Sequence, residues 1–251
     1  SRYAIYMVES PLVAVVAPIS DKKEYVIDKW LKHIFQLTYP NFVIILVDNS
    51  QTKDLFSRLK NQYPEISSIR HFSPKNLTSV MYITHSQNIL VSEAKLFGAK
   101  YFMSIECDVF PPNNVIELLL AHKSPVACGV YPYMDGINRK PLLITIEEDI
   151  TGHIRHRNRE YAEGLLFMDG KPKYNFGQGI GCALIDMSIF NLVSFRFEKG
   201  MEHHSDTFFY QDLYFRGIDP IVDTSIVCKH ENSDWAETKK EDEELLSQIH
   251  K

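Results

Sequence analysis

The chain has 251 residues, of which 45% are hydrophobic and 24% are charged. This balance is typical of a globular protein and excludes a disordered chain, a collagen and a coiled coil. A chain of this length buries roughly 70% of its unfolded surface, so it needs no disulfide or metal to fold. The formal net charge of −5 lacks the basic field that non-specific nucleic-acid binding requires, and we do not expect a nucleic-acid partner.

The sequence shows no segment with the pattern of a membrane span or of a signal peptide. The longest apolar stretch, Pro11 to Ile19, falls short of the about 20 residues that a span needs and lacks a charged leader. The cysteines form no C-x-x-C pair and lie within apolar runs: Cys107, Cys128, Cys182 and Cys228. We therefore expect reduced cysteines and a cytoplasmic protein, with peripheral attachment to a membrane left open.

The first half of the chain alternates predicted strands and helices. Continuous apolar runs closed by Pro or polar residues predict buried parallel strands, and apolar residues at helical spacing predict helices. The expected strands are 13–18, 42–47, 66–72, 101–105 and 126–131, and the expected helices are 21–37, 53–63, 83–98 and 113–122. Gly98 has the position of a helix C-cap. This alternation indicates βαβ units, and so an α/β fold with a Rossmann-like, mostly parallel sheet flanked by helices.

The second half is more irregular. Between 135 and 176 we expect loops and a β-hairpin with strand-like pieces at 141–146 and 164–167. The remaining predicted elements are strands at 182–185 and 221–228 and helices at 187–193, 206–215 and 237–250. Without an internal repeat or a low-complexity linker, the simplest organisation is one domain over residues 1–251.

Acidic side chains follow two of the predicted parallel strands. Asp48 closes the second strand, and Glu106-Cys107-Asp108 follows the strand at 101–105. Ligands of open α/β sheets bind outside the carboxyl ends of the strands. On an extended segment Glu106 and Asp108 point the same way, while Cys107 points back into the core. One such acid often only caps the next element, but the combination suits ribose or base contacts and a divalent cation that bridges to phosphates.

Several further residues have two interpretations each. Asp206 is either a helix N-cap or a functional acid, and His230 is either a satisfied histidine at a strand end or a ligand. His203 and His204 are typical of a solvent-facing loop, with a metal or phosphate role as the alternative. The basic run 153–159 is either a solvated hairpin face or a site that holds an anionic acceptor or a diphosphate. The glycines at 177, 179 and 181 precede a strand, which is the wrong place for a dinucleotide loop. They indicate backbone that lies close to a ligand or to itself.

Taken in order, these motifs resemble those of the family 2 type glycosyltransferases, which have the GT-A fold. The resemblance extends over residues 11–232. The matching motifs are Ala17-Pro18-Ile19-Ser20; Tyr39-Pro40-Asn41-Phe42 followed by Val47-Asp48-Asn49-Ser50; Ser86-Gln87-Asn88; Glu106-Cys107-Asp108; residues 177–185; and Ser205-Asp206 with Gly217, Asp223 and His230. No single motif is specific, whereas six in the right order are. Residues 11–131 would then form the nucleotide-sugar-binding half, residues 132–232 the acceptor and catalytic half, and residues 233–251 a C-terminal helix.

The resemblance implies a metal-dependent, inverting enzyme that moves a sugar from a nucleoside diphosphate sugar to an acceptor hydroxyl. The donor would be a UDP or GDP sugar, and the cation would be Mn²⁺ or Mg²⁺. Asp206 would be the general base, and Asp108 and His230 would be metal ligands. Glu106 would contact the ribose or stand behind the metal ligands.

The resemblance also assigns residues to the nucleotide. Pro18 and Ile19 would line the base pocket, and Asp48 would bind the base through a hydrogen bond. Asn88 would lie near the diphosphate. Cys107, in the middle of the DxD-like motif, is included among the donor-binding residues.

The sequence departs from the family pattern in three places. Glu106 replaces the first acid of the DxD motif, and Ser205 replaces the Glu that precedes the catalytic Asp. Asp212 stands where the family often has an Arg, and Arg216 follows four residues later. The last two departures concern the acceptor side more than the donor site.

Two other functions compete with glycosyl transfer: nucleotidyl transfer and binding without catalysis. A sugar nucleotidyltransferase would carry a glycine-rich basic loop after the first strand, and the loop 18–23 has no glycine. A catalytically inactive nucleotide- or sugar-binding module of the same fold stays open because of Ser205. The acceptor would be a glycan, a lipid-linked sugar or a protein. Aromatic residues of the second half either stack on sugars or pack a hairpin: Tyr131, Tyr133, Tyr161, Tyr174 and Phe176.

Overall fold

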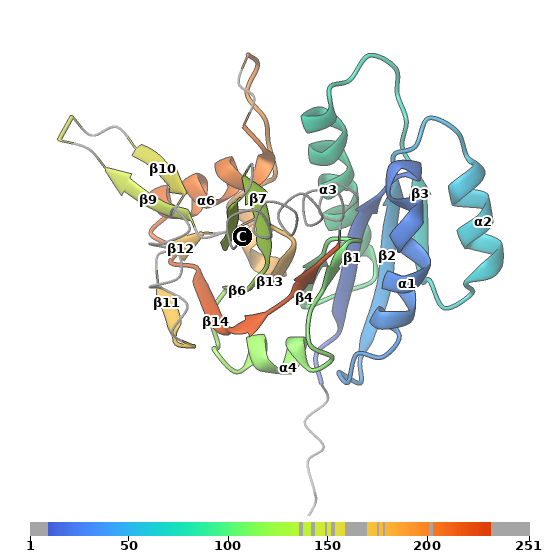
Figure 1. Cartoon of the computed structure of the whole chain (residues 1–251), viewed down its shortest axis with the longest axis horizontal. Coiled ribbons are helices and arrows are strands. Elements are labelled where there is room, and N and C mark those ends of the chain that lie inside the picture. The colour runs from blue at the N-terminus through green and yellow to red at the C-terminus, as the bar shows by residue number, and fades with distance from the viewer. Residues whose placement is uncertain are drawn as a thin grey trace, which may run out of the picture.

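The computed structural model describes residues 10–231 apart from gaps at 136–137, 142–143, 149, 152–153, 159–169, 175, 178 and 201–202. Its main sheet has eight strands in the order β11-β14-β6-β13-β4-β1-β2-β3 (Figure 1). All of these strands except β13 and β11 run in one direction, which confirms the mostly parallel α/β sheet. The strands are β1 Val13–Ile19, β2 Phe42–Asp48, β3 Ser68–His71, β4 Tyr101–Ile105, β6 Val126–Val130, β11 Pro172–Tyr174, β13 Cys182–Asp186 and β14 Ile221–Val227.

Helices cover both faces of this sheet. The α-helices are α1 Glu24–Ile34, α2 Asp54–Gln62, α3 Ser79–Leu96, α4 Val115–Leu120 and α6 Ser205–Phe215, and the 3-10 helices are η1 Asp21–Lys23 and η2 Met187–Asn191. Side chains of β1 alternate between the two faces: Val15 packs in the cluster of α1, α2 and α4, and Val16 packs in the cluster of α3 and α6. Because both faces of the strand are buried, its sequence is a continuous apolar run rather than an alternating one.

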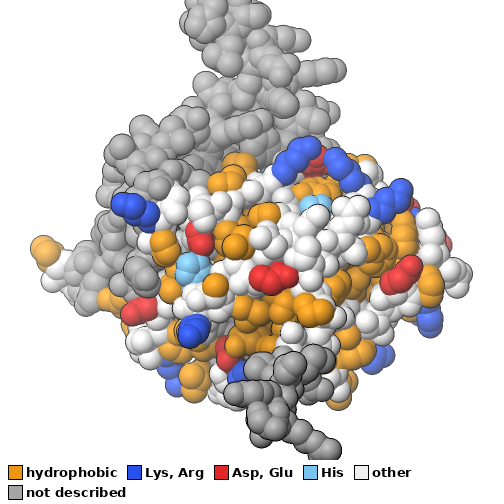
Figure 2. Space-filling model, turned by 90° about the horizontal axis from the view of Figure 1, so that it is seen from below, with side chains coloured by type: hydrophobic (Ala, Val, Ile, Leu, Met, Phe, Trp, Pro, Cys, Tyr) orange, Lys and Arg blue, Asp and Glu red, His pale blue; other side chains and the backbone are white. Residues whose placement is uncertain are grey.

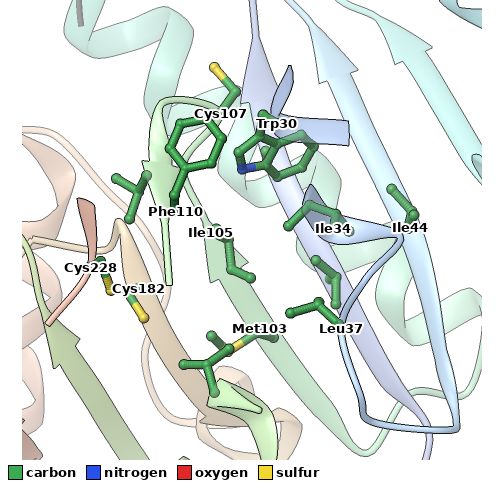
Figure 3. Packing of buried hydrophobic residues seen from close by; sticks show 14 of the residues in the cluster. Trp30, Ile34, Leu37, Ile44, Met103, Ile105, Cys107, Phe110, Cys182 and Cys228 are labelled. Atoms are coloured by element: carbon green, nitrogen blue, oxygen red, sulfur yellow. The ribbon is translucent and has the colours of Figure 1, made fainter. Parts of the chain in front are cut away.

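The cluster on the α1 face lies directly below the acidic strand end. Trp30 and Ile34 of α1 face Met103 and Ile105 of β4, as Figure 3 shows. The Trp30 side chain is fully buried. Phe110 packs beside Cys107 in the same cluster, so the residue between the two acids of the motif is anchored in the core. This packing fixes the backbone that carries Glu106 and Asp108.

Several boundaries in the first half differ from the prediction, most clearly those of α1, α3 and α4, since α1 covers Glu24–Ile34 of the predicted 21–37. Helix α3 begins four residues before Ile83, because the Thr78 hydroxyl caps it by accepting a hydrogen bond from the Met81 amide at 3.3 Å. Helix α4 is shorter at both ends than the predicted 113–122. The predicted C-cap at Gly98 is confirmed, since Gly98 has the left-handed φ of 71° that favours glycine.

The second half contains more strands than the single hairpin that we expected. Two hairpins pair in antiparallel fashion: β7 Pro132–Asp135 with β8 Asn138–Pro141, and β9 Ile144–Glu148 with β10 Ile154–Asn158. The predicted piece 141–146 is therefore divided between β8 and β9. A short strand β12, Phe176–Gly177, adds to β9. The predicted pieces at 164–167 and 237–250 lie outside the described residues.

A second, two-stranded sheet joins distant parts of the chain. Strand β5, Val109–Phe110, pairs in antiparallel fashion with β15, Lys229–His230, so that His230 is opposite Val109. The Glu231 amide also donates a hydrogen bond to the Asp108 carbonyl at 2.7 Å. This pairing brings the end of the chain's last described strand beside Asp108.

The carboxyl ends of β1, β2 and β4 meet at one edge of the sheet because these strands are parallel. Figure 2 shows the molecule from the opposite end, near α4, where broad hydrophobic areas lie between scattered charges. Within the described part of the chain, no helix combines the length and the apolar character that crossing a membrane would require.

Candidate active site

A cavity of about 490 Å³ opens at the carboxyl ends of β1, β2 and β4. Pro18 and Ile19 at the end of β1 line it, as do Glu106, Cys107 and Asp108 after β4. The structure thus brings five of the predicted donor-site residues to one cavity, at the edge of the sheet where ligands of open α/β folds bind.

Glu106, Asp108 and His230 form a cluster at this cavity. Each offers one ligand atom, and these atoms lie within 4.8 Å of one another. The two acids come from the turn after β4, and His230 comes from β15 through its pairing with β5. Two carboxylates and one imidazole at this spacing fit a divalent cation, and the imidazole favours Mn²⁺ over Mg²⁺, which prefers oxygen ligands.

The orientation of His230 also fits a metal ligand. Its Nδ1 lies 2.7 Å from the Pro132 carbonyl oxygen, to which it donates a hydrogen bond. Its Nε2 lies 3.4 Å from Oδ2 of Asp108. The Tyr131 ring meets the imidazole edge to face, with centroids 5.4 Å apart. A hydrogen bond at one ring nitrogen that fixes the tautomer and directs the other nitrogen inward is typical of metal-binding histidines.

Tyr131 is itself held by a glycine. The Gly181 amide donates a hydrogen bond to the Tyr131 hydroxyl at 3.0 Å, and the Gly181 carbonyl accepts one from the Glu106 amide at 3.1 Å. A Cβ on Gly181 would lie 2.5 Å from the tyrosine ring. Of the two interpretations of this glycine-rich segment, the structure thus favours the second at Gly181, whose backbone packs closely against another part of the protein rather than against a ligand. Tyr131 is buried and serves packing rather than sugar stacking.

The surroundings of Glu106 and Asp108 shift the pKa values of these two acids in opposite directions. Burial, with the neighbouring charge of Asp108, raises the pKa of Glu106 to about 7. Burial alone would also raise the pKa of Asp108, but the hydrogen bond and charge of His230 and the charge of Lys23 lower it below its ordinary value. At neutral pH Asp108 is thus the firmly ionised member of the pair, as a metal-binding carboxylate must be.

Asp48 lies fully buried at the end of β2. Its Oδ1 accepts hydrogen bonds from the Ser50 amide at 2.9 Å and from the Ser50 hydroxyl at 2.5 Å. Its Oδ2 is buried and has no hydrogen-bond partner among the described residues. Asp48 is not among the residues that line the cavity, whereas its neighbours Asn49 and Ser50 are. An unpaired buried carboxylate oxygen next to the cavity suits an N–H donor of a ligand.

Asp206 is partly buried in the first turn of α6. Its Oδ1 accepts a hydrogen bond from the Thr207 amide at 2.8 Å. Burial raises the pKa of Asp206 above its ordinary value, against the opposing charge of His204 and the Thr207 amide. The charge of Asp206 in turn helps to raise the pKa of Glu106, so the two carboxyl groups are electrostatic neighbours. Asp206 is not among the residues that line the cavity, but its charge acts on the acidic cluster, and its role as the base stays a prediction.

Ser205, which replaces the family's Glu, faces the cavity wall. Its buried hydroxyl lies 2.5 Å from Oε1 of Gln87, to which it donates a hydrogen bond. Gln87 belongs to α3 and lines the cavity. This contact ties the first turn of α6 to α3 beside Asp206.

Asn88 does not lie where we expected it. Its amide donates a hydrogen bond to the Phe195 carbonyl at 2.9 Å, and it is not among the residues that line the cavity. Adjacent residues of a helix point about 100° apart, so only one of Gln87 and Asn88 can face the cavity, and packing of α3 selects Gln87. The structure places Gln87 of this helix segment at the cavity, and a role for Asn88 near the diphosphate stays a prediction.

Sequence reasoning also missed Lys23, which lines the cavity at the end of η1. Its Nζ lies 2.6 Å from Oδ2 of Asp108. Two adjacent lysines directly after the first strand are the sequence feature that could have identified it, because this strand end is at the predicted ligand-binding edge of the sheet.

His203 and His204 are exposed, as predicted for a loop. Tyr161 and the start of the basic run at His153 lie outside the described residues. The structure gives the backbone, but not the side-chain surroundings, of Tyr133, Tyr174 and Phe176.

Neither a protein-family model nor a curated protein sequence matches the chain. Solved structures do match it. GalNAc-T7, solved with UDP, GalNAc and Mn²⁺, is 12% identical with a TM-score of 0.59, over 89% of this chain and 44% of that one. The mannosyltransferase PcManGT of Pyrobaculum calidifontis, solved with GDP-Man and Mn²⁺, is 14% identical with a TM-score of 0.58, over 89% and 57%.

TarS of S. aureus, residues 1–349 in complex with UDP-GlcNAc, is 11% identical with a TM-score of 0.55. The match covers 88% of this chain and 59% of that one, so this chain spans about half the length of the solved proteins. At such low identity the likeness concerns the fold. The chain has the GT-A fold of these glycosyltransferases.

Proposed function

We propose that the chain is a metal-dependent glycosyltransferase of the family 2 type, which transfers a sugar from a nucleoside diphosphate sugar to an acceptor hydroxyl. The observation that carries the proposal is the cluster of Glu106, Asp108 and His230, with ligand atoms within 4.8 Å of one another at the cavity of a GT-A fold. The similar structures were solved with UDP, GDP-Man or UDP-GlcNAc, and two of them contain Mn²⁺. A UDP or GDP sugar is therefore the proposed donor.

Asp108 and His230 would hold the cation, and Glu106 would contact the ribose or support the ligands. When bound, a divalent cation stabilises the charge that develops on the leaving diphosphate. The chain contributes the orientation of its ligands: Pro132 fixes the His230 tautomer, and Cys107 anchors the turn in the core.

The base of the nucleotide would bind at the ends of β1 and β2. Pro18 and Ile19 supply an apolar wall, and Asp48 supplies a buried carboxylate with Oδ2 still available for an N–H group. A carboxylate that already accepts two hydrogen bonds on Oδ1 is held in one orientation, which favours recognition of a base edge over non-specific contact.

Asp206 would take the proton of the acceptor hydroxyl as that oxygen attacks the anomeric carbon. Attack opposite the diphosphate inverts the anomeric centre. Burial raises the pKa of Asp206, which makes it a stronger base than an exposed Asp. The acceptor would be a glycan, a lipid-linked sugar or a protein, bound by the half of the chain from 132 to 232. We propose that this half and residues 11–131 work as one catalytic domain.

The experiment that tests the proposal is thermal unfolding with a panel of nucleotides and nucleotide sugars. UDP, GDP and dTDP and their sugars are each tested with Mn²⁺, with Mg²⁺ and with EDTA. A ligand at 100 times its Kd adds about 2.7 kcal/mol of stability, which is readily measured. Stabilisation by one nucleoside diphosphate only in the presence of metal is the expected result. No stabilisation by any combination would contradict the proposal.

Donor turnover then separates an enzyme from an inactive module. A catalyst should hydrolyse or transfer the bound sugar slowly with metal present. A protein that binds the metal–nucleotide pair but releases no nucleoside diphosphate would be the binding module that Ser205 left open.

A further inference from the structure

The Lys23 ammonium group forms an ion pair with the Asp108 oxygen that also lies near His230. Its ammonium nitrogen lies 2.6 Å from Oδ2 of Asp108, and the same Oδ2 is the oxygen that lies 3.4 Å from Nε2 of His230. The Asp108 side chain is only 6% exposed, so few directions of approach to this oxygen remain. A divalent cation that binds Oδ2 of Asp108 together with His230 therefore has to displace the ammonium group or share this oxygen with it.

The two partners differ in their freedom to move. Asp108 is fixed by its backbone, because its carbonyl accepts a hydrogen bond from the Glu231 amide within the β5–β15 pairing. The Lys23 side chain is 35% exposed and has a flexible four-carbon stem. The lysine can therefore leave the carboxylate without any change in the backbone.

The cavity determines where the displaced ammonium group can go. Lys23 and Asp108 both line it, and the cavity extends to Pro18 and Ile19 at the end of β1. A ligand that spans from the base pocket to the metal site has its phosphates between these two ends. An ammonium group released from Asp108 then lies within reach of the phosphates, for which a lysine is a suitable point charge.

We propose that Lys23 holds Asp108 while the metal site is vacant and turns to the diphosphate of the donor when a divalent cation binds. The inference rests on the proposed function and adds a diphosphate-binding residue to it. It predicts opposite effects on two ligands: Lys23 opposes binding of the metal alone and favours binding of the nucleotide once metal is present. Metal and nucleotide should consequently bind cooperatively, and the coupling should depend on Lys23.

The test compares Lys23→Met with the native chain in two titrations. Free Mn²⁺ is measured by electron paramagnetic resonance without nucleotide, and UDP or GDP binding is measured by calorimetry at saturating Mn²⁺. Lys23→Met should bind Mn²⁺ alone at least about fivefold more tightly and should bind the nucleoside diphosphate at least about fivefold more weakly. Lys23→Arg, which keeps the charge, should recover part of the nucleotide affinity.

Lys29→Met is the matched control. Lys29 also forms a 2.6 Å ion pair near this site, with Glu231, but it does not line the cavity. Its loss removes the same charge, so any effect of Lys23→Met that Lys29→Met reproduces comes from net charge and would overturn the inference.

Two further results would overturn it. Unchanged or weaker binding of Mn²⁺ to Lys23→Met, with the native chain binding normally, would make the Lys23–Asp108 pair a purely structural contact and leave the proposed function intact. Absence of Mn²⁺ binding to the native chain with every nucleotide would instead reject the proposed function and this inference together.

Discussion

Gly181 gives a prediction whose magnitude follows from the geometry. In Gly181→Ala the new Cβ would lie 2.5 Å from Cζ, 2.7 Å from Cε1 and 2.8 Å from the hydroxyl oxygen of Tyr131. Real Cβ atoms essentially never come so close, so the ring or the backbone has to move. Tyr131 is only 3% exposed and packs against His230, so it has no open space into which to turn.

Two costs combine in this variant. Overpacking of a filled core costs about 1–3 kcal/mol. Displacement of the tyrosine hydroxyl removes the acceptor of the buried Gly181 amide, which adds about 1–3 kcal/mol. We expect Gly181→Ala to lower the free energy of unfolding by about 2–6 kcal/mol, and to weaken Mn²⁺ binding through the altered support of His230.

The assay is urea unfolding at equilibrium, in two backgrounds. In Tyr131→Leu the ring is absent, so the same Gly181→Ala change should cost much less, and the double-mutant cycle should show a coupling energy above about 0.5 kcal/mol. An equal cost in both backgrounds, or a cost below about 0.5 kcal/mol in the native background, would refute the argument from the tyrosine contact.

Four other substitutions test the assignment of the site and the fold. Asp206→Asn should keep metal-dependent donor binding and lose transfer, so full transfer activity would remove Asp206 from the mechanism. Asp108→Ala should weaken metal-dependent nucleotide binding, and equal affinity with Mn²⁺ and with EDTA in both proteins would exclude the metal role. Asp48→Asn should weaken nucleotide binding without changing the affinity for Mn²⁺ alone, measured by calorimetry. Hydrogen bonds from Ser225 and His122 outweigh burial and lower the pKa of Asp223, so its stabilising effect is present above the unfolded value of about 3.9 and is lost as pH falls through the lower folded value. Asp223→Asn should therefore cost about 1–3 kcal/mol at pH 7 and less at pH 3 in urea unfolding, and a cost independent of pH would contradict this assignment.

The nucleotide-binding half of the fold was predictable from the sequence because its signals are local and redundant. Strand β4 has the predicted bounds, since five residues between charged neighbours leave little freedom in their placement. The hairpins of the second half were less predictable, because short strands such as β8, Asn138–Pro141, have neither an apolar run nor a clear alternation. Strand β12 also pairs with a partner that is distant in the sequence, β9.

The candidate site likewise combines features that local sequence predicts with features that depend on long-range contacts. The acids after β4 were identified because they follow a buried strand at the carboxyl edge of the sheet. The extended segment that we expected there is instead a turn, in which the Val109 amide donates a hydrogen bond to the Glu106 carbonyl at 2.9 Å. The proximity of His230 to Asp108 depends on β5 and β15, which are two residues long and give no periodic signal. The choice of Gln87 over Asn88 depends on the rotation of α3, which packing sets and a motif does not. The sequence therefore indicated which residues could carry the chemistry, whereas their arrangement around the site depends on tertiary contacts.

The two departures on α6 explain how this chain holds its proposed base. Where the family pattern has a Glu, Ser205 donates a buried hydrogen bond to Gln87. Where the pattern often has an Arg, Asp212 accepts hydrogen bonds from Arg196 at 2.7 and 3.0 Å. The guanidinium of this second contact is supplied by the loop before α6. Both contacts fix the helix whose first turn carries Asp206, one to α3 and one to the preceding loop. The departures therefore change the means by which α6 is anchored while leaving the carboxylate beside the acidic cluster, which favours an active enzyme over a module that has lost its catalytic residue.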